Sequence, residues 1–286
     1  MLGNIYVYRS GGMGDVLWLE PVLKSLSSKY KNVYFYTNFK SLFENIPYKN
    51  VIIKDIPPGW FRAILKLLNF VSGKKKYHRL DGYCYEAMPK MPILHAYQKY
   101  FGLEKTEEYP TIYLSEKESS TKVSNKIKYA VLHLDANSSS NFRKVYGINW
   151  EIIVRSLAQK NIDIIQIGNR IEPIEGTTIF SGNLRELIQL INHSSLFIGV
   201  DSGPSHIAAS LNIPSIIFFG SVNPWFRHFK SKFKGVILQQ YCEYAGCYHE
   251  VIGGSGQECK LVGKNGIPKC CVHSDQTLLN ALDTII

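Results

Sequence analysis

A polar turn in the second half of the chain combines side chains suited to binding an anion. Residues 201–206, Asp-Ser-Gly-Pro-Ser-His, follow the apolar run 196–200. Pro204 predicts a helix start, because the N–H that proline lacks would have no intrahelical partner there. Free N–H groups at a helix start attract phosphate. The predicted diphosphate contacts are the backbone of Gly203, Ser205 and His206 and the side chains of Ser202, Ser205 and His206. In the simpler alternative, Asp201 or Ser202 caps the helix and nothing binds.

A second candidate site is the glycine-rich turn at residues 11–15, Gly-Gly-Met-Gly-Asp, which follows the strand-like residues 4–9. Glycine lets a backbone turn sharply and approach a ligand closely, so Gly12 and Gly14 are predicted to contact a ligand. The spacing lacks the third glycine of a dinucleotide-binding fingerprint. Asp15 has two interpretations. It caps the following helix, or its carboxylate takes a proton from an acceptor hydroxyl.

A pair of cations, Arg143-Lys144, comes shortly after the strand-like residues 129–134. A cation in such a position can neutralise the charge of a departing diphosphate, and Lys144 is the candidate for this role. The alternative is that Lys144 is a solvated surface side chain.

Five of the six cysteines fall between residues 242 and 271. Disulfides are disfavoured in the cytoplasm, and four thiolates can close a tetrahedral site around zinc or iron. No pair has the tight C-x2-C spacing, so buried inert thiols are the alternative. The candidate metal ligands are Cys242, Cys247, Cys259 and Cys271.

The elements that must position these residues follow an alternating pattern. In the first half, strand 4–9, a helix over 16–26 and strand 32–37 form a βαβ unit, which predicts a parallel sheet. The second half repeats strand and helix every 25–30 residues or so, as in a doubly wound α/β domain. We therefore predict two Rossmann-like domains, 1–125 and 126–286, facing across a cleft with binding loops at the carboxyl ends of their strands. The polar stretch 115–128 is the predicted linker.

Composition limits the classes of partner. The chain of 286 residues has 33 Lys and Arg against 23 Asp and Glu, a net charge of +10, which favours anionic ligands. No nucleic-acid-binding motif is present, and no apolar run is long enough to span a membrane. The opening residues resemble no signal peptide, so a cytoplasmic protein is expected. The apolar segment 60–71, followed by Lys74, Lys75 and Lys76, predicts either contact with the anionic inner membrane face or a core helix with solvated lysines.

Together these segments resemble the heptosyltransferases of glycosyltransferase family 9, which have the GT-B fold. The most specific part is the motif at 201–206 followed by Ile-Ala-Ala, then Pro214 and Phe219-Gly220. Gly14-Asp15 with Pro21 is similar to the opening motif of the family. Lys144 with Tyr146 and Trp150 is similar to its lysine-aromatic segment.

The resemblance implies an inverting, metal-independent transfer from ADP-heptose or a related nucleotide-diphosphate sugar. It implies that domain 1–125 faces the acceptor and that domain 126–286 holds the donor. Asp15 would be the general base and Lys144 would bind the diphosphate. Asp201 would hold sugar hydroxyls, and Ser202, Gly203 and His206 would hold phosphate.

The resemblance leaves the acceptor open between lipopolysaccharide core, another glycan or lipid-linked sugar, and a protein. The cysteine-rich end is similar in character to heptosyltransferases that modify autotransporter proteins, whose cysteine motif binds iron. Two further alternatives remain: a UDP- or GDP-sugar donor, and a nucleotide-sugar-binding protein without turnover.

Overall fold

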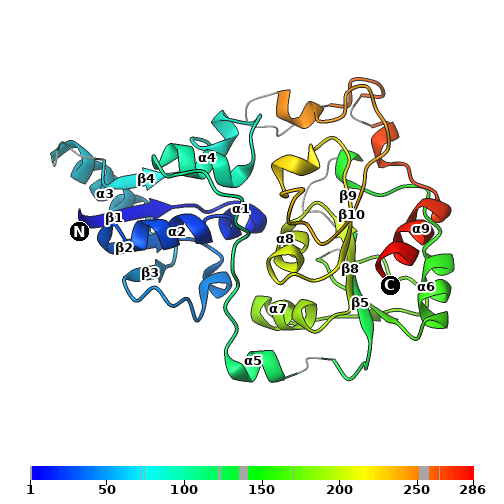
Figure 1. Cartoon of the computed structure of the whole chain (residues 1–286). Helices are drawn as coiled ribbons and strands as arrows, with labels where there is room; N and C mark the ends of the chain where they lie inside the picture. The colour runs from blue at the N-terminus through cyan, green and yellow to red at the C-terminus, as the bar shows by residue number, and fades with distance from the viewer. Residues whose placement is uncertain are drawn as a thin grey trace. The chain divides into compact units, whose positions relative to one another are not determined.

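A computed structural model of the chain, shown in Figure 1, describes residues 2–71, 73, 75–121, 124–134, 141–169, 171–250, 258–263 and 265–286. The chain divides into two compact units, Met1–Ser115 and Glu116–Ile286. Each unit has its own parallel sheet, so the predicted α/β class with two doubly wound halves is confirmed. Among the helices of the described residues, none is long and apolar enough to cross a membrane.

The first unit is built on a four-stranded parallel sheet in the order β3-β2-β1-β4. The central strand β1 is exposed at its first two residues and buried at its last two, which places its end in the core. The strands are β1 Leu2–Tyr8, β2 Tyr30–Tyr36, β3 Val51–Lys54 and β4 Tyr77–Arg79, and the helices are α1 Met13–Leu17, α2 Glu20–Ser27, α3 Gly59–Val71 and α4 Ile93–Tyr100.

The second unit is built on a six-stranded parallel sheet in the order β10-β9-β8-β5-β6-β7. Its central strands β5 Tyr129–His133, β8 Leu196–Val200 and β9 Ser215–Phe218 are buried at every residue. Helices cover both faces of a parallel sheet, so such strands are continuous apolar runs without alternation. The outer strands are β6 Asp163–Gln166, β7 Thr178–Ile179 and β10 Gly235–Leu238.

The helices of the second unit cover its sheet on both faces, and Figure 1 shows α6 and α9 on one side and α7 and α8 on the other. Apolar residues of α6 and α9 pack into the same core cluster as β5, β8 and β9. Helix α7 begins with a capping box made by Asn183 and Glu186, as the polar residues before its apolar pattern require. The helices are α5 Glu116–Ser120, α6 Trp150–Gln159, α7 Leu184–Asn192, α8 Gly203–Ser210 and α9 Asp275–Ile285.

The predicted linker 115–128 differs from what the structure shows. Its first part is helix α5, which belongs to the second unit, and the two units divide before it, at residue 115. Glu118 of α5 accepts two hydrogen bonds from the guanidinium of Arg185 on α7, both 2.7 Å long. Such a bidentate pair anchors a helix that is polar all round. Composition alone does not reveal a partner so distant in the sequence.

Candidate functional site

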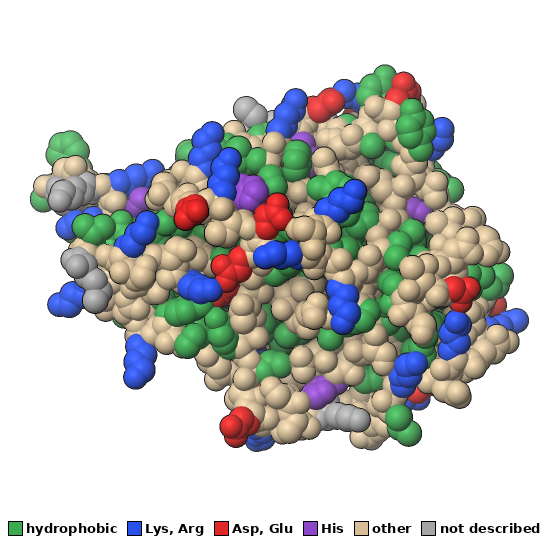
Figure 2. All heavy atoms as spheres, in the orientation of Figure 1, with side chains coloured by type: hydrophobic (Ala, Val, Ile, Leu, Met, Phe, Trp, Pro, Cys, Tyr) green, Lys and Arg blue, Asp and Glu red, His purple; other side chains and the backbone are tan. Residues whose placement is uncertain are grey.

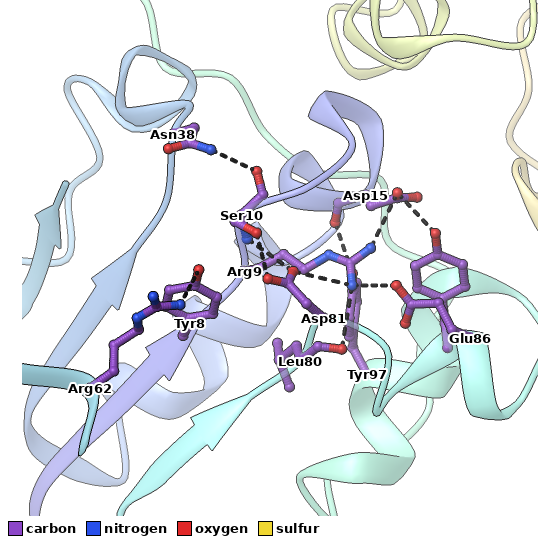
Figure 3. Close-up of polar contacts among 11 residues, drawn as sticks. Tyr8, Arg9, Ser10, Asp15, Asn38, Arg62, Leu80, Asp81, Glu86 and Tyr97 are labelled. Atoms are coloured by element: carbon purple, nitrogen blue, oxygen red, sulfur yellow. Dashed lines mark hydrogen bonds and ion pairs between the residues drawn. The ribbon is translucent and has the colours of Figure 1, made fainter. Parts of the chain in front are cut away.

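A buried cation, Arg9, directly follows β1 and lies beside the glycine turn of the first unit (Figure 3). The Arg9 side chain is 3% exposed and pairs with three carboxylates: Asp15 at 3.3 Å, Asp81 at 3.6 Å and Glu86 at 2.5 Å. A buried guanidinium is tolerated when carboxylates surround it in this way. The sequence analysis did not select Arg9, although it lies beside the predicted turn.

Asp15 is held in one orientation by this cluster. Its Oδ2 accepts hydrogen bonds from Tyr85 Oη at 2.9 Å and from Arg9 at 3.3 Å. The hydroxyl of Tyr97 donates to the backbone oxygen of Asp15 at 3.1 Å, which fixes the main chain as well. Figure 3 shows both side-chain bonds meeting on one carboxylate oxygen. Within the described part of the chain Oδ1 accepts no hydrogen bond, and the side chain is 21% exposed. An oriented carboxylate with one open oxygen can accept a proton.

The alternative in which Asp15 caps the helix is wrong. Helix α1 begins at Met13 and its N-cap residue is Gly12, so Asp15 lies within the first helical turn. Gly12 has φ +62°, and a Cβ at this position would lie 2.0 Å from Asp15 Oδ2. Only glycine leaves space for the carboxylate in this turn. That Gly12 and Gly14 also contact a sugar donor stays a prediction.

In the second unit, Asp201 directly follows β8 and is 5% exposed. Its Oδ1 lies 3.6 Å from His206 Nε2, and its Oδ2 lies 3.6 Å from Arg143 and 4.0 Å from Arg227. Burial by itself raises the pKa of Asp201, but the contacts with His206 and the two guanidinium groups hold that pKa well below its usual range. The carboxylate is therefore charged at neutral pH.

Two guanidinium groups against one carboxylate leave this cluster with a net positive charge. Arg143 ends the short 3-10 turn Asn141–Arg143, and Arg227 follows the 3-10 turn Pro224–Phe226. Both guanidinium carbons lie over the ring of Tyr248, at 5.4 and 5.9 Å from its centre. Arginines fixed on an aromatic ring make a preorganised site for an anion such as a phosphate. From the sequence, Arg143 was named only as the partner of Lys144 in a pair of cations, and Arg227 and Tyr248 were not predicted as members of the site.

A second imidazole, His228, stacks on His206 with ring centres 5.1 Å apart and planes 25° apart. Burial, and then the charge of His206, push the pKa of His228 well below its ordinary value. His228 is therefore neutral and supports the ring of His206 as a packing surface. No motif in the sequence marked it.

The hydroxyl groups of the polar turn have defined partners within the fold. Ser202 is the N-cap residue of α8, and its Oγ lies 3.0 Å from His133 Nδ1. Ser205 is fully buried, and its Oγ donates to Ser202 O and accepts from Ser202 N. The backbone N–H of His206 donates to Ser202 O at 3.3 Å, so the prediction that this N–H is free was wrong. Ser202 and Gly203 remain half-exposed at the start of the helix.

Lys144 is exposed and directly follows Arg143. Within the described residues Lys144 forms no ion pair, whereas its neighbour Arg143 reaches Asp201. A part in binding diphosphate stays a prediction for Lys144. The cation that the structure brings to the polar turn from this segment is Arg143.

Four cysteines line one pocket of the second unit, together with Phe142, Tyr244 and Leu261 among others. Three of the four predicted metal ligands line this pocket, which Cys270 also lines. The fourth, Cys271, lies next to it, with its Sγ 3.9 Å from that of Cys270. Among the residues that the structure describes, no group of three or more His, Cys, Asp or Glu is arranged to hold a metal ion. The lining cysteines are Cys242, Cys247, Cys259 and Cys270.

Residues 181–247 match the sequence model of glycosyltransferase family 9 (heptosyltransferase). This segment contains the polar turn with Asp201 and His206, and also Arg227. This segment of the chain is therefore similar to glycosyltransferase family 9. Over 102 residues the chain is 33% identical to lipopolysaccharide heptosyltransferase 3 of Escherichia coli, a match that covers 32% of the chain and 29% of that protein. The matched region thus spans less than a third of this relative.

Solved structures of glycosyltransferases share the fold over nearly the whole chain. The iron-containing dodecameric glycosyltransferase TibC from enterotoxigenic E. coli matches with a TM-score of 0.74 and 14% identity, covering 99% of this chain and 77% of that one. ADP-heptose lps heptosyltransferase II of E. coli matches with a TM-score of 0.65 and 13% identity, covering 99% of this chain and 98% of that one. The family 9 segment therefore lies within a fold shared with heptosyltransferase structures.

Proposed function

We propose that the chain is an inverting glycosyltransferase that moves a heptose from ADP-heptose to a hydroxyl acceptor. The observation that carries the proposal is the overlap of the family 9 segment with the cationic cluster around Asp201. TibC has been solved in complex with ADP-D-β-D-heptose, and its fold covers this chain. ADP-heptose is therefore the first donor to test, ahead of UDP- and GDP-sugars.

The donor is held by the second unit in this proposal. Arg143 and Arg227 bind the diphosphate, because their guanidinium groups outnumber the carboxylate beside them. Lys144, next to Arg143 and exposed, adds a charge that neutralises the leaving group. Ser202 and Gly203 at the start of α8 and the His206 ring complete the phosphate contacts, and Asp201 accepts hydrogen bonds from sugar hydroxyls.

Asp15 acts as the general base. The acceptor oxygen attacks the anomeric carbon while the bond from that carbon to the diphosphate oxygen breaks, and Asp15 Oδ1 takes the acceptor proton. Arg9 and Tyr85 act as positioning residues, since they hold Oδ2 and leave Oδ1 open. A single displacement inverts the anomeric centre and leaves ADP as the product. Glycan, lipid-linked or protein hydroxyls all fit this chemistry, and lipopolysaccharide core is the acceptor that the names of the relatives favour.

Substitution of the proposed base tests the mechanism. Asp15→Asn keeps the shape of the side chain but cannot take the proton, so kcat for ADP release from ADP-heptose should fall about 100-fold or more. The assay uses truncated lipopolysaccharide core and, separately, a bacterial extract as acceptor. The matched control is Asp55→Asn, whose side chain is 79% exposed in the same unit. Asp15→Asn with full activity overturns the mechanism, and a wild-type protein that binds ADP-heptose without turnover supports a binding role instead.

We also propose that transfer itself needs no metal and that the cysteine pocket binds a structural zinc or iron ion. The four lining thiols would have to draw together around the ion, since the described residues are not arranged to hold one. TibC is described as iron-containing, which supports testing iron first. When bound, the ion would cross-link the segments that carry the four thiols.

Metal analysis of the purified protein tests the pocket. Cys270→Ser should lower the metal content to less than half that of the wild type, because one of four thiolates is lost. Cys84→Ser is the matched control, since Cys84 is a buried free cysteine of the first unit. Equal metal content in the two variants would contradict the assignment of Cys270, and a metal-free wild type would contradict the metal site altogether.

A further inference from the structure

Helix α3 of the first unit has apolar side chains on the face that packs on the sheet and on a neighbouring face that is exposed. Its inner face packs Phe61, Leu65 and Leu68 against the cluster of Tyr8, Tyr36 and Tyr77 on the sheet. Its outer face presents large apolar side chains at positions 60, 64, 67 and 71, a spacing that places them on one side of a helix. The exposed fractions are 67% for Trp60, 47% for Ile64, 57% for Leu67, 86% for Phe70 and 74% for Val71.

This outer face is larger than the scattered apolar residues of an ordinary surface. Single exposed leucines are common, but a contiguous apolar patch marks a binding surface. The inner face already supplies the contacts that hold α3 on the sheet, so the outer residues are not needed for the core. Figure 2 shows hydrophobic side chains beside Lys and Arg at the left end of the view, where α3 lies in Figure 1.

The charged residues in the sequence on either side of α3, between Asp55 and Asp81, are all cations. From Asp55 to Asp81 the sequence has six Lys and Arg and no acidic residue between them. Lys66 lies exposed on α3 itself, and Lys75 follows it with Nζ 4.6 Å from the centre of the Tyr100 ring. Arg79 lies 5.9 Å from the ring of Tyr83, which is 65% exposed. Lys74, named with this group in the sequence, lies outside the described residues.

An apolar helical face bordered only by cations fits an anionic lipid surface. The apolar side chains enter the boundary between headgroups and acyl chains, and each Lys or Arg near the surface adds electrostatic attraction to the anionic lipids. Tryptophan, present here as Trp60, favours that boundary. A second copy of the same face would bring like charges together, which disfavours self-association.

We propose that the outer face of α3, with the nearby cations Lys66, Lys75 and Arg79, docks the protein on an anionic phospholipid surface. Docking of this face on a membrane does not depend on the glycosyltransferase activity. The membrane would cover a surface that the core of the first unit leaves exposed. The bound membrane would hold the protein near acceptors that are themselves anchored in lipid.

Vesicle flotation with the full chain tests the docking. The wild type should bind phosphatidylcholine vesicles containing 30% phosphatidylglycerol, and binding should fall at least tenfold in pure phosphatidylcholine or at high salt. Leu67→Ser with Phe70→Ser should lower binding to the anionic vesicles at least tenfold. The matched control is Ile179→Ser with Ile152→Ser, which replaces residues that are 47% and 42% exposed in the other unit.

A variant without two of the cations and a measurement of the oligomeric state distinguish lipid binding from self-association. Lys66→Gln with Lys75→Gln leaves the apolar face intact and should lower binding to the anionic vesicles while leaving the melting temperature unchanged. Wild-type protein that ignores anionic vesicles, or an α3 variant that binds them like the control, overturns the proposal. The wild type could instead be an oligomer that Leu67→Ser with Phe70→Ser converts to a monomer without any change in vesicle binding. That result would also overturn the proposal and would assign the face to a second copy. ADP release by the α3 variant reports separately on the proposed activity.

Discussion

At the scale of single residues, the cluster around Asp201 depends on charges from three separate segments. Asp201 follows a strand, Arg143 ends a turn after β5, and Arg227 follows the turn after β9. Because the carboxylate is buried, it is stable as an anion only while the cations remain beside it. The same cations are the groups that a diphosphate would meet, so binding and stability are linked at this point.

The acid sensitivity of the protein should follow from Asp201. Its folded-state pKa lies below the value of about 3.9 for an unfolded Asp, so the unfolded chain takes up the proton first as pH falls. The stabilisation is therefore complete above about pH 4 and is lost progressively below it. Asp201→Asn should lower the free energy of unfolding at pH 7 by about 3 kcal/mol. Below pH 4 the free energy of unfolding of this variant should fall less steeply than that of the wild type. Urea unfolding at several pH values measures both effects.

The control for this prediction is Asp163→Asn, which removes a carboxylate that is 50% exposed and paired with Lys126 in the same unit. Exposed pairs contribute little, so this variant should keep the wild-type pH profile. If Asp201→Asn and Asp163→Asn show the same profile, the buried charge is not what links stability to pH.

The sequence predicted the type and place of some site residues and missed others for a physical reason. Asp15, Asp201 and His206 lie in short motifs next to strand ends, where neighbours in the sequence are neighbours in space. Arg227 and Tyr248 reach the same cluster by tertiary folding, and no local spacing announces that contact. Arg143 and Lys144 are neighbours in the sequence, and only the fold determines that Arg143 reaches Asp201 while Lys144 is exposed.

At the scale of the elements, the turn between β1 and α1 places the proposed base by excluding side chains. A Cβ on Gly12 would collide with the carboxylate of Asp15, whereas a Cβ on Gly11 would meet nothing within 4 Å. Gly11 and Gly12 are therefore not equivalent, because only the position of Gly12 excludes a side chain. The pattern predicted a close approach of backbone to ligand, and the observed close approach is to Asp15.

Alanine at these two positions separates the effects. Gly12→Ala should displace Asp15 and lower the transfer rate at least tenfold. Its positive φ should also cost about 1–2 kcal/mol of stability. Gly11→Ala should change neither quantity by a measurable amount. Initial rates of ADP release and urea unfolding of both variants check this, and equal rates for the two variants would show that the turn does not position the base.

At the scale of the whole molecule, the alternation of strand and helix was enough to predict two parallel α/β halves. Continuous apolar runs such as 196–200 indicated strands covered on both faces, and β8 is buried throughout. The order of the strands and the place of α5 were not predictable, because they depend on contacts such as that of Arg185 with Glu118. The cysteine pocket is likewise a product of folding, since Phe142 lines it together with cysteines that lie about a hundred residues or more further along the chain.

The central claim is that the cluster around Asp201 binds the diphosphate of an ADP-linked sugar, and a thermal-shift panel of ADP, UDP, GDP and dTDP tests it most directly. A ligand that binds only the folded state at 100 times its Kd adds about 2.7 kcal/mol of stability, which corresponds to a rise in Tm of about 5 °C or more. We predict that rise with ADP and a smaller one with the other nucleotides. A larger rise with UDP or GDP would assign a different donor, and an unchanged Tm with all four would contradict the account.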